Sequence, residues 1–100
     1  MNCLVVLALL VSAVAAVDVI LYQHDQFNGP STEIRGSDCV QLDSIWNDQA
    51  SSINTRGNCV IVWENGQCRG KNERIQPGTN CHSNLGECGM NDKVTSLSDC

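Results

Sequence analysis

The sequence contains few aromatic residues and few basic ones, and the second shortage limits its possible partners. Only 4% of the 100 residues are Phe, Trp or Tyr. Six Lys and Arg residues stand against eleven Asp and Glu residues, which gives a formal net charge of −5 at pH 7. The basic residues are scattered, and a surface of this charge does not attract nucleic acid or anionic membranes. We therefore expect no nucleic-acid partner.

The sequence also lacks the signatures of common enzymes. No segment resembles a nucleophile elbow, an HExxH zinc motif or a P-loop. The two histidines, His24 and His82, are the only candidates for a general base of that type. His24 follows the first predicted strand, and His82 is next to Cys81. A histidine in either position is more often a surface or packing residue than a general base. We predict that the chain is not an enzyme.

A long apolar run is missing everywhere except near the N-terminus. Residues 4–11 are all Leu, Val or Ala, and small residues dominate positions 12–16. The run is too short to span a bilayer and is typical of a secretory signal peptide with its cleavage zone. We predict a signal peptide at residues 1–16, cleaved after Ala15 or Ala16, and a secreted, extracellular product without stable membrane insertion.

Cysteine, in contrast, is abundant. Cleavage would remove Cys3 and leave six cysteines in residues 17–100. An even number in a small secreted domain indicates three disulfides, for which fifteen pairings exist. Zinc is the alternative, but no two of these cysteines have the spacing of a zinc knuckle. The six are Cys39, Cys59, Cys68, Cys81, Cys88 and Cys100.

Residues 17–100 form a repeat of two units, 17–57 and 58–100. Residues 18–23 are matched 41 positions later by residues 59–64, and the spacing slips to 44 further along the chain. A period near forty residues indicates duplicated supersecondary units that share a core. We therefore predict one domain made of two similar halves.

The secondary structure predicted within the units is all-β. Short runs of β-branched and aromatic residues alternate with turn signals such as Asn65-Gly66 and Asn28-Gly29-Pro30. Strands spaced by about ten residues are typical of a sandwich, and we expect both tryptophans, Trp46 and Trp63, in its core. The predicted strands are 19–22, 32–35, 39–42, 52–55, 60–63, 72–75 and 94–98.

The most informative pattern is a polar run that occurs twice. Residues 47–52 read NDQASS and residues 91–96 read NDKVTS. Each run combines amide and carboxylate oxygens with hydroxyls, and such oxygen donors suit Ca²⁺. A single run could equally be a polar turn before a strand. Two copies at matching places of a repeat favour a cation site.

Together with an aromatic pattern, these runs resemble the βγ-crystallin family over residues 18–100. That family builds two Greek-key motifs of four strands each into a wedge-shaped sandwich, so the resemblance implies about eight short strands. An aromatic-x4-aromatic-x-Gly pattern marks its first hairpin, where glycine avoids a steric conflict. The matching residues are Tyr22, Phe27 and Gly29, then Trp63, Cys68 and Gly70. Cys68 stands where an aromatic residue is expected, which leaves the shape of the second hairpin open.

The resemblance also implies calcium ligands, about two ions, and sites that work crosswise between the motifs. Asp48 and Asp92 would bind through side-chain oxygens, and Ser51 and Thr95 through hydroxyls. Backbone carbonyls would come from the four remaining ligand residues, Gln23, Gln49, Glu64 and Lys93. The polar residues that support the loops without binding the ion would be Asn47, Ser52, Asn91 and Ser96.

Strand adjacency in a Greek key gives an expected disulfide pairing. The first strand of the second motif starts near the end of the last strand, which favours Cys59–Cys100. Cys81–Cys88 would clamp a local loop, and Cys39–Cys68 would remain. Peptide mapping without reduction tests this pairing.

The predicted function is that of a secreted, monomeric calcium-binding domain in which calcium is structural. The alternative is a secreted effector on the same scaffold, such as a proteinase inhibitor, an antimicrobial protein or a toxin, because a fold does not dictate a function. An inhibitor would need an exposed, braced loop, and the only candidate lies between Cys81 and Cys88. A purely structural protein with degenerate metal sites is a third option, against which the complete motifs argue.

Overall fold

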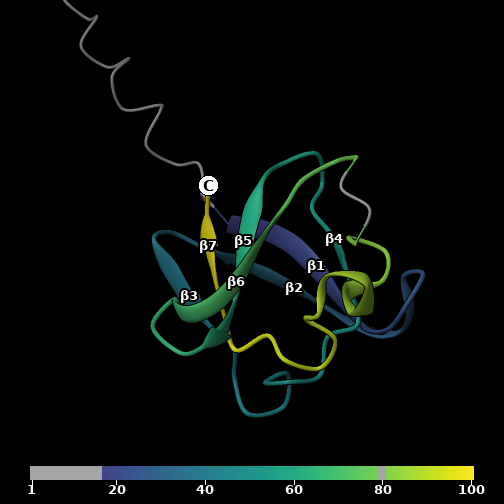
Figure 1. Ribbon diagram of the computed structural model, residues 1–100, viewed down its shortest axis with the longest axis horizontal. Helices are drawn as coiled ribbons and strands as arrows, with labels where there is room; N and C mark the ends of the chain where they lie inside the picture. Colours follow the sequence, from purple (N-terminus) through teal and green to yellow (C-terminus); the bar gives the residue numbers. More distant parts are fainter. Residues whose placement is uncertain (1–16, 79–80) are drawn as a thin grey trace, which may run out of the picture.

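The computed structural model describes residues 17–78 and 81–100 (Figure 1). The predicted signal peptide, with Cys3, lies outside the described residues. Within them, a 3₁₀ helix, η2 (Leu85–Cys88), is the one helical element. In this part of the chain no helix is long and apolar enough to cross a membrane. The strands are β1 (Val17–His24), β2 (Asn28–Gly36), β3 (Cys39–Gln41), β4 (Ser52–Asn54), β5 (Val60–Asn65), β6 (Arg69–Ile75) and β7 (Ser96–Asp99).

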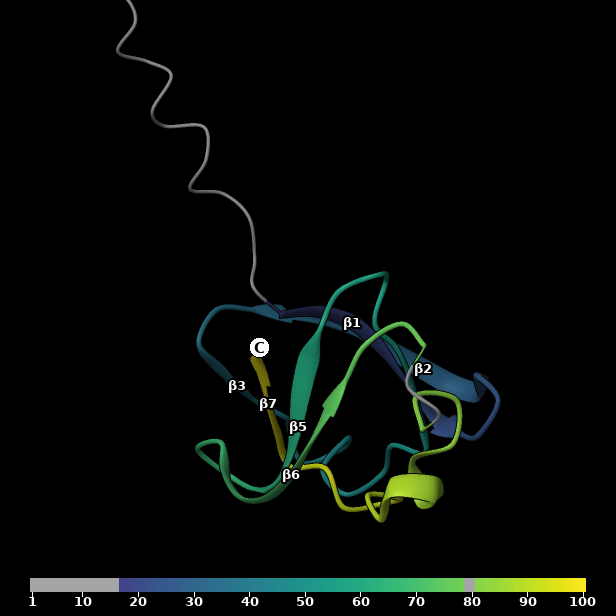
Figure 2. The ribbon, with the colours of Figure 1, turned by 45° about the horizontal axis from the view of Figure 1, so that its top comes forward.

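The strands form two antiparallel sheets, which confirms the predicted all-β sandwich. One sheet has the order β2-β1-β4 and the other the order β3-β7-β5-β6. Strand β3 belongs to the first unit of the repeat but pairs with β7 of the second unit. This exchange, visible in Figures 1 and 2, makes the two units one packed body.

One expected strand is replaced by less regular structure in the described residues. In the second unit, the counterpart of β3 would lie beside β4, and the His82 carbonyl does accept a hydrogen bond there from the Ile53 amide at 2.8 Å. The chain then turns into η2 at Leu85. The short loop closed by Cys81 and Cys88 leaves too few residues for a regular strand.

The two first hairpins have the same shape, although Cys68 replaces an aromatic residue in the second. Gln26 and Phe27 have φ angles of 57° and 58°, and their counterparts Gln67 and Cys68 have 60° and 53°. In the first hairpin the rings of Phe27 and Tyr22 meet edge to face, with centroids 5.6 Å apart. The backbone of the hairpin is therefore independent of the aromatic contact.

Glycine is required after each of these turns. Gly29 and Gly70 have φ angles of 81° and 86°, where a residue with a Cβ is strained. A Cβ at Gly29 would also collide with the ring of His24, and one at Gly70 with the amide of Asn65. Strand β2 already begins at residue 28, so the prediction of a turn at residues 28–30 was wrong, and the turn lies just before it.

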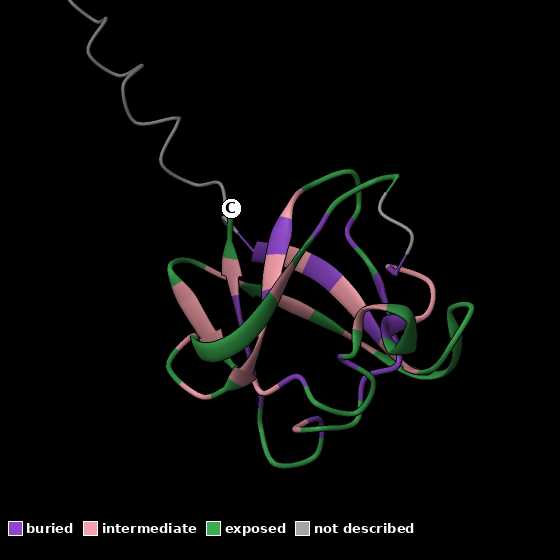
Figure 3. Ribbon diagram, in the orientation of Figure 1, coloured by how far each residue is buried: buried purple, intermediate pink, exposed green. Residues whose placement is uncertain are grey.

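The core lies between the sheets and takes alternate residues from the central strands (Figure 3). Trp46 is buried, as predicted. Trp63 is only half-buried, and its indole Nε1 donates to the Ser98 hydroxyl at 2.8 Å, so its assignment to the core was wrong. The buried apolar residues are Val17, Val19, Leu21, Leu42, Trp46, Ala50, Ile53, Val60, Val62, Ile75, Cys81, Leu85, Met90, Val94 and Leu97.

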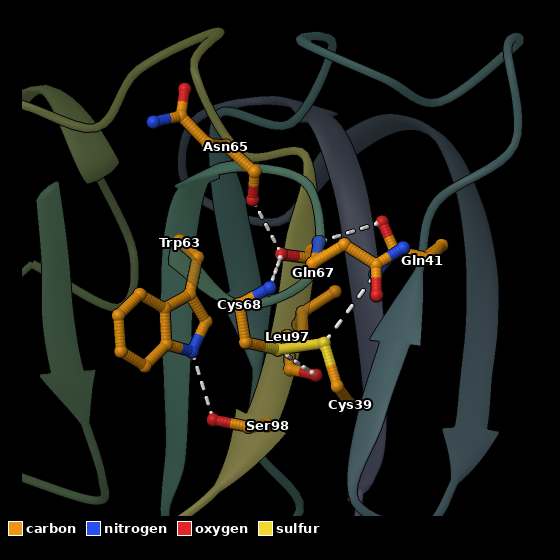
Figure 4. The surroundings of a disulfide bond; sticks show 9 residues. Cys39, Gln41, Trp63, Asn65, Gln67, Cys68, Leu97 and Ser98 are labelled. Atoms are coloured by element: carbon orange, nitrogen blue, oxygen red, sulfur yellow. Dashed lines mark hydrogen bonds between the residues drawn. A yellow bond between two sulfur atoms is a disulfide. The ribbon is translucent and has the colours of Figure 1, made fainter. Parts of the chain in front are cut away.

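Three disulfides brace this sandwich, and they are the pairs expected above. Cys59–Cys100 joins the start of β5 to the end of β7, and Cys81–Cys88 closes the loop that leads into η2. Cys39–Cys68 connects β3 of the first unit to the hairpin of the second, with Cα atoms 6.0 Å apart (Figure 4). This last bond replaces the missing aromatic contact by a covalent link between units.

Candidate metal centre

Each of the two polar runs is a loop anchored by apolar residues. Ala50 and Val94, at the fourth position of the runs, are fully buried and fix the loops to the core. Asp48 and Asp92, at the second position, have φ angles of 60° and 55°. Among residues with a side chain, Asp and Asn tolerate this left-handed conformation best. The backbone shape thus favours the same residue types that can bind a cation.

Backbone hydrogen bonds connect the loops to each other across the repeat. The Asp48 amide donates to the Val94 carbonyl, and the Asp92 amide donates to the Ala50 carbonyl, both at 3.0 Å. Each aspartate is therefore held against the loop of the other unit. The two loops are therefore joined crosswise, and metal binding between them stays a prediction.

The side chains meet in the same crosswise way. The hydroxyl of Ser51 lies 3.5 Å from Oδ1 of Asp92, and the hydroxyl of Thr95 lies 3.4 Å from Oδ1 of Asp48. Both distances are long for a hydrogen bond between a hydroxyl and a carboxylate. Neighbouring oxygens that each lie about 2.4 Å from a calcium ion at right angles are about 3.4 Å apart. The spacing of the oxygen pairs thus fits two ligands of one cation.

The hairpins add a residue to each pair. Hydrogen-bonded pairing between β1 and β2 is interrupted at Gln23, and that between β5 and β6 at Glu64. The residue before each interruption accepts a hydrogen bond at 2.9 Å through its carbonyl, from the Ser51 amide in the first case and the Thr95 amide in the second. Each hairpin residue is thereby placed beside one oxygen pair.

The predicted ligand residues therefore form two clusters. Site one contains Gln23, Ser51 and Asp92, and site two contains Glu64, Thr95 and Asp48. Gln49 and Lys93 directly follow Asp48 and Asp92 in the loops, and their role as carbonyl ligands stays a prediction. The side chain of Lys93 is exposed, as its prediction as a carbonyl ligand requires. The two sites are related by the internal repeat.

Both clusters are poor in formal charge. No group of three or more His, Cys, Asp or Glu side chains that could hold a metal occurs among residues 17–78 and 81–100. Zinc, which prefers nitrogen and sulfur ligands, does not fit such clusters. Calcium accepts neutral hydroxyl and carbonyl oxygens alongside carboxylates. The donor set is therefore compatible with calcium at modest affinity.

Two serines predicted to support the loops tie them to the hairpins. The Ser52 hydroxyl accepts from the Phe27 amide at 3.0 Å and donates to the His24 carbonyl at 2.7 Å. The Ser96 hydroxyl makes the equivalent bonds, at 3.0 Å from the Cys68 amide and 2.6 Å to the Asn65 carbonyl. Each serine thus holds one hairpin turn in position over its site.

Removal of the Ser52 hydroxyl should destabilise the domain. In Ser52→Ala, the Phe27 amide and the His24 carbonyl of the first hairpin lose the buried Ser52 hydroxyl as their partner, which costs about 1–2 kcal/mol of unfolding free energy. Urea unfolding measures this loss, and Ser44→Ala at an exposed position is the matched control. Equal stability of the two variants would contradict the supporting role.

The asparagines at the first position of the loops differ. Asn91 Nδ2 lies 3.4 Å from Oδ2 of Asp92, so it can steady that carboxylate. Asn47 Oδ1 is buried and has no hydrogen-bond partner in the described part of the chain. An unpaired buried oxygen needs a water, a donor or a cation to offset the cost of its burial.

The loop between Cys81 and Cys88 does not have the form of an inhibitory loop. It enters η2, where the Asn84 side chain caps the helix by accepting from the Gly86 amide at 3.0 Å. Leu85 is fully buried, and its amide donates to the Ser51 carbonyl at 2.8 Å. This loop therefore packs against site one instead of projecting from the surface.

An open hollow of about 310 Å³ lies against site one. It was not predicted, because its residues come from four separate segments that show no common pattern in the sequence. Both ribbon views place η2 beside the end of the β1–β2 hairpin, where this hollow lies (Figures 1 and 2). Its lining residues are His24, Asp25, Ser51, Asn84, Gly86 and Asn91.

Comparison with known proteins agrees with the observed fold. A family model described as Beta/Gamma crystallin matches residues 18–99. A βγ-crystallin from an archaeon is similar in structure, with 25% identity, a TM-score of 0.68, and coverage of 83% of this chain and 96% of that one. Comparison with curated proteins gives no match.

Two further solved structures share the fold. The βγ-crystallin from Ciona intestinalis has 23% identity and a TM-score of 0.68, with coverage of 83% of this chain and 99% of the other. A βγ-crystallin domain from Clostridium beijerinckii has 21% identity and a TM-score of 0.64, with coverage of 81% and 94%. The alignments take in nearly the whole of each relative.

Proposed function

Because the chain belongs to the βγ-crystallin family, we propose that it is a secreted domain that binds calcium at two sites shared between its Greek-key motifs. The observation that carries this proposal is the crosswise approach of Asp92 to Ser51 and of Asp48 to Thr95. The same loop supplies a carboxylate to one site and a hydroxyl to the other. The family is mostly structural and non-enzymatic, and we propose no catalytic activity.

The ligands of the proposed sites imply a modest affinity for calcium. Each draws on about four protein residues, whereas calcium takes 6–8 oxygens, so water or another ligand completes the shell. Low ligand charge places the dissociation constants in the range of sensor and extracellular modules, from about 10⁻⁷ to 10⁻³ M. Outside the cell, where calcium is in the upper part of this range, the sites would be filled continuously. Calcium would then be structural and not a signal.

Loading should raise the stability of the fold. Binding to the native state alone adds about 2.7 kcal/mol per site when calcium exceeds the dissociation constant a hundredfold. Three disulfides already stabilise this small domain, and the free energy of calcium binding would add to their contribution. Such a disulfide framework fits a protein that acts in an oxidising compartment.

Titration of the metal-free, oxidised protein tests the proposal. We expect about two calcium ions per chain by calorimetry. Terbium should give luminescence sensitised by Trp46, which directly precedes the first loop. Magnesium is the control, since it demands near-ideal octahedral geometry and gives up its water reluctantly. Absence of both heat and luminescence at millimolar metal would refute calcium binding and leave only the fold.

A further inference from the structure

The hollow beside site one is a polar cavity that the proposed calcium sites do not explain. It is bordered by the end of the first hairpin, the loop before η2, and the second metal loop. Its volume of about 310 Å³ lies at the lower end of the range of small-molecule pockets, which begins at about 300 Å³. A single small ligand of that size fits beside Ser51, which belongs to both the hollow and site one.

The lining has the chemistry of a site for hydroxyl groups. Asp25 brings a carboxylate that only accepts hydrogen bonds, and His24 brings an imidazole. Asn84 and Asn91 bring amides that both donate and accept. Drug-like pockets are mostly apolar, and this one is not. A ligand with several neighbouring hydroxyls can satisfy these groups, whereas an apolar ligand would leave them unpaired.

The incomplete metal shell adds a second attraction for such a ligand. Site one has a single carboxylate, Asp92, among about four protein ligands, so at least about two calcium positions are left for other oxygens. Ser51 lines the hollow as well as the site, so a ligand in the hollow would lie beside an ion bound at site one. Two adjacent hydroxyls on one ring are spaced to occupy two neighbouring positions on one ion.

The surroundings of the hairpin at site two differ from those at site one. At site one, the Gln26 amide is bound by the backbone carbonyl of Ser83 at 2.7 Å. At site two, the corresponding Gln67 amide is bound by the side chain of Gln41, through Oε1 at 3.2 Å (Figure 4). The same oxygen would lie 3.1 Å from a Cβ placed at Gly66, the counterpart of Asp25. Site two thus has a glutamine side chain where site one has the Ser83 carbonyl.

We propose that site one and its hollow together bind a neutral sugar unit through two vicinal hydroxyls, with calcium as the bridge. Asp25, Asn84 and Asn91 would bind the remaining hydroxyls. The proposal rests on the proposed calcium function. It assigns sugar binding to site one, because Ser51 of that site lines the hollow.

Nuclear magnetic resonance of the ¹⁵N-labelled, calcium-loaded protein tests this inference. Methyl α-mannopyranoside and methyl β-galactopyranoside serve as probes, and cyclohexanol, which lacks a vicinal diol, serves as the control ligand. We expect both or one of the sugars to shift the side-chain amide signals of Asn84 and Asn91 and the backbone signal of Gly86. The shifts should disappear in a calcium chelator.

Three variants separate the roles of the residues. Asp25→Ala should keep both calcium ions and weaken sugar binding about tenfold, because a hydrogen bond to a charged group is lost. Asp92→Gly should lose sugar binding with site one, whereas Asp48→Gly should keep it. Asp99→Ala, at an exposed position on β7, is the control and should change nothing.

The outcomes distinguish this inference from the proposed function. Two bound calcium ions without sugar-dependent shifts would overturn the sugar site and leave the proposed calcium binding intact. Shifts that persist in chelator would overturn the bridging role of the ion. Failure to bind calcium would remove both. Binding to immobilised glycans in calcium would identify the terminal unit of a glycan as the source of the hydroxyls, and shifts without glycan binding would identify a free sugar.

Discussion

The Asp92→Gly variant should lose one calcium ion. Asp92 provides the only carboxylate of site one, and its Oδ1 lies 3.5 Å from the Ser51 hydroxyl that would share the ion. Loss of one partner of a close charge pair costs about 2 kcal/mol or more, which corresponds to a roughly 30-fold weaker dissociation constant. Calorimetry should therefore show one ion at concentrations that fill both sites of the wild type.

Glycine is the appropriate replacement, since the φ angle of Asp92 is 55°. Alanine would add backbone strain to the loss of the ligand, whereas glycine adopts this conformation readily. Asp92→Asn is the matched control, because it keeps an oxygen and the left-handed backbone but removes the charge. It should bind two ions, with one of them weakened.

The Asp48→Gly variant tests the crosswise arrangement from the other side. It should remove the ion shared with Thr95 at site two. Site one should be disturbed less, because Asp48 lies in the same loop as Ser51 but approaches Thr95 and not Ser51. If Asp48→Gly removed the ion bound by Ser51 instead, each motif would form its own site and the crosswise assignment would be wrong. Terbium displaces calcium and perturbs the signals of residues near the bound ion. Separate resonance signals of Ser51 and Thr95, followed during a terbium titration of the variant, therefore distinguish the two results.

Loss of the Cys39–Cys68 disulfide should cost the domain more stability than loss of Cys81–Cys88. In the chain-entropy account, a bond that closes 29 residues restricts the unfolded chain by about 3.6 kcal/mol, and one that closes 7 residues by about 2.4 kcal/mol. Urea unfolding of the two double Cys→Ser variants, under oxidising conditions, measures the difference. The opposite order would mean that strain or residual structure outweighs chain entropy.

The hairpin of the second unit allows a sharper test of the same bond. Cys68 occupies the position of Phe27 and shares its φ angle, 53° against 58°, so a phenylalanine fits the backbone. The variant Cys39→Val, Cys68→Phe should recover about 1 kcal/mol relative to the double serine variant through a contact with Trp63. No recovery would indicate that the disulfide acts only by linking the two units.

Several features of the fold followed from local sequence patterns. The run of β-branched and aromatic residues at 19–22 predicted a strand, and in the structure buried and half-buried residues alternate along it because a strand points successive side chains to opposite faces. The repeat predicted two similar hairpins, and the positive φ angles of Gly29 and Gly70 show why glycine stands at those positions. The all-β sandwich and its family were therefore predicted correctly, whereas calcium binding stays a prediction.

Other features depended on which distant segments meet. The half-burial of Trp63 follows from its place on the sheet and its bond to Ser98, not from its residue type. The counterpart of β3 is missing because the Cys81–Cys88 loop and η2 make local hydrogen bonds and a local disulfide in place of the hydrogen bonds between paired strands. Neither the half-burial of Trp63 nor the missing strand can be predicted from the spacing of apolar residues in the sequence.

The sequence by itself determined the two oxygen-rich loops, their aspartates and the hairpins beside them, because backbone conformation and donor chemistry are properties of a few adjacent residues. Only the tertiary structure decided which hydroxyl each aspartate approaches, that site one adjoins an open polar hollow, and that Gln41 binds the Gln67 amide of the second hairpin. The physical reason is that these contacts join residues 26 to 47 positions apart. Packing of the two units, and no local preference, brings them together.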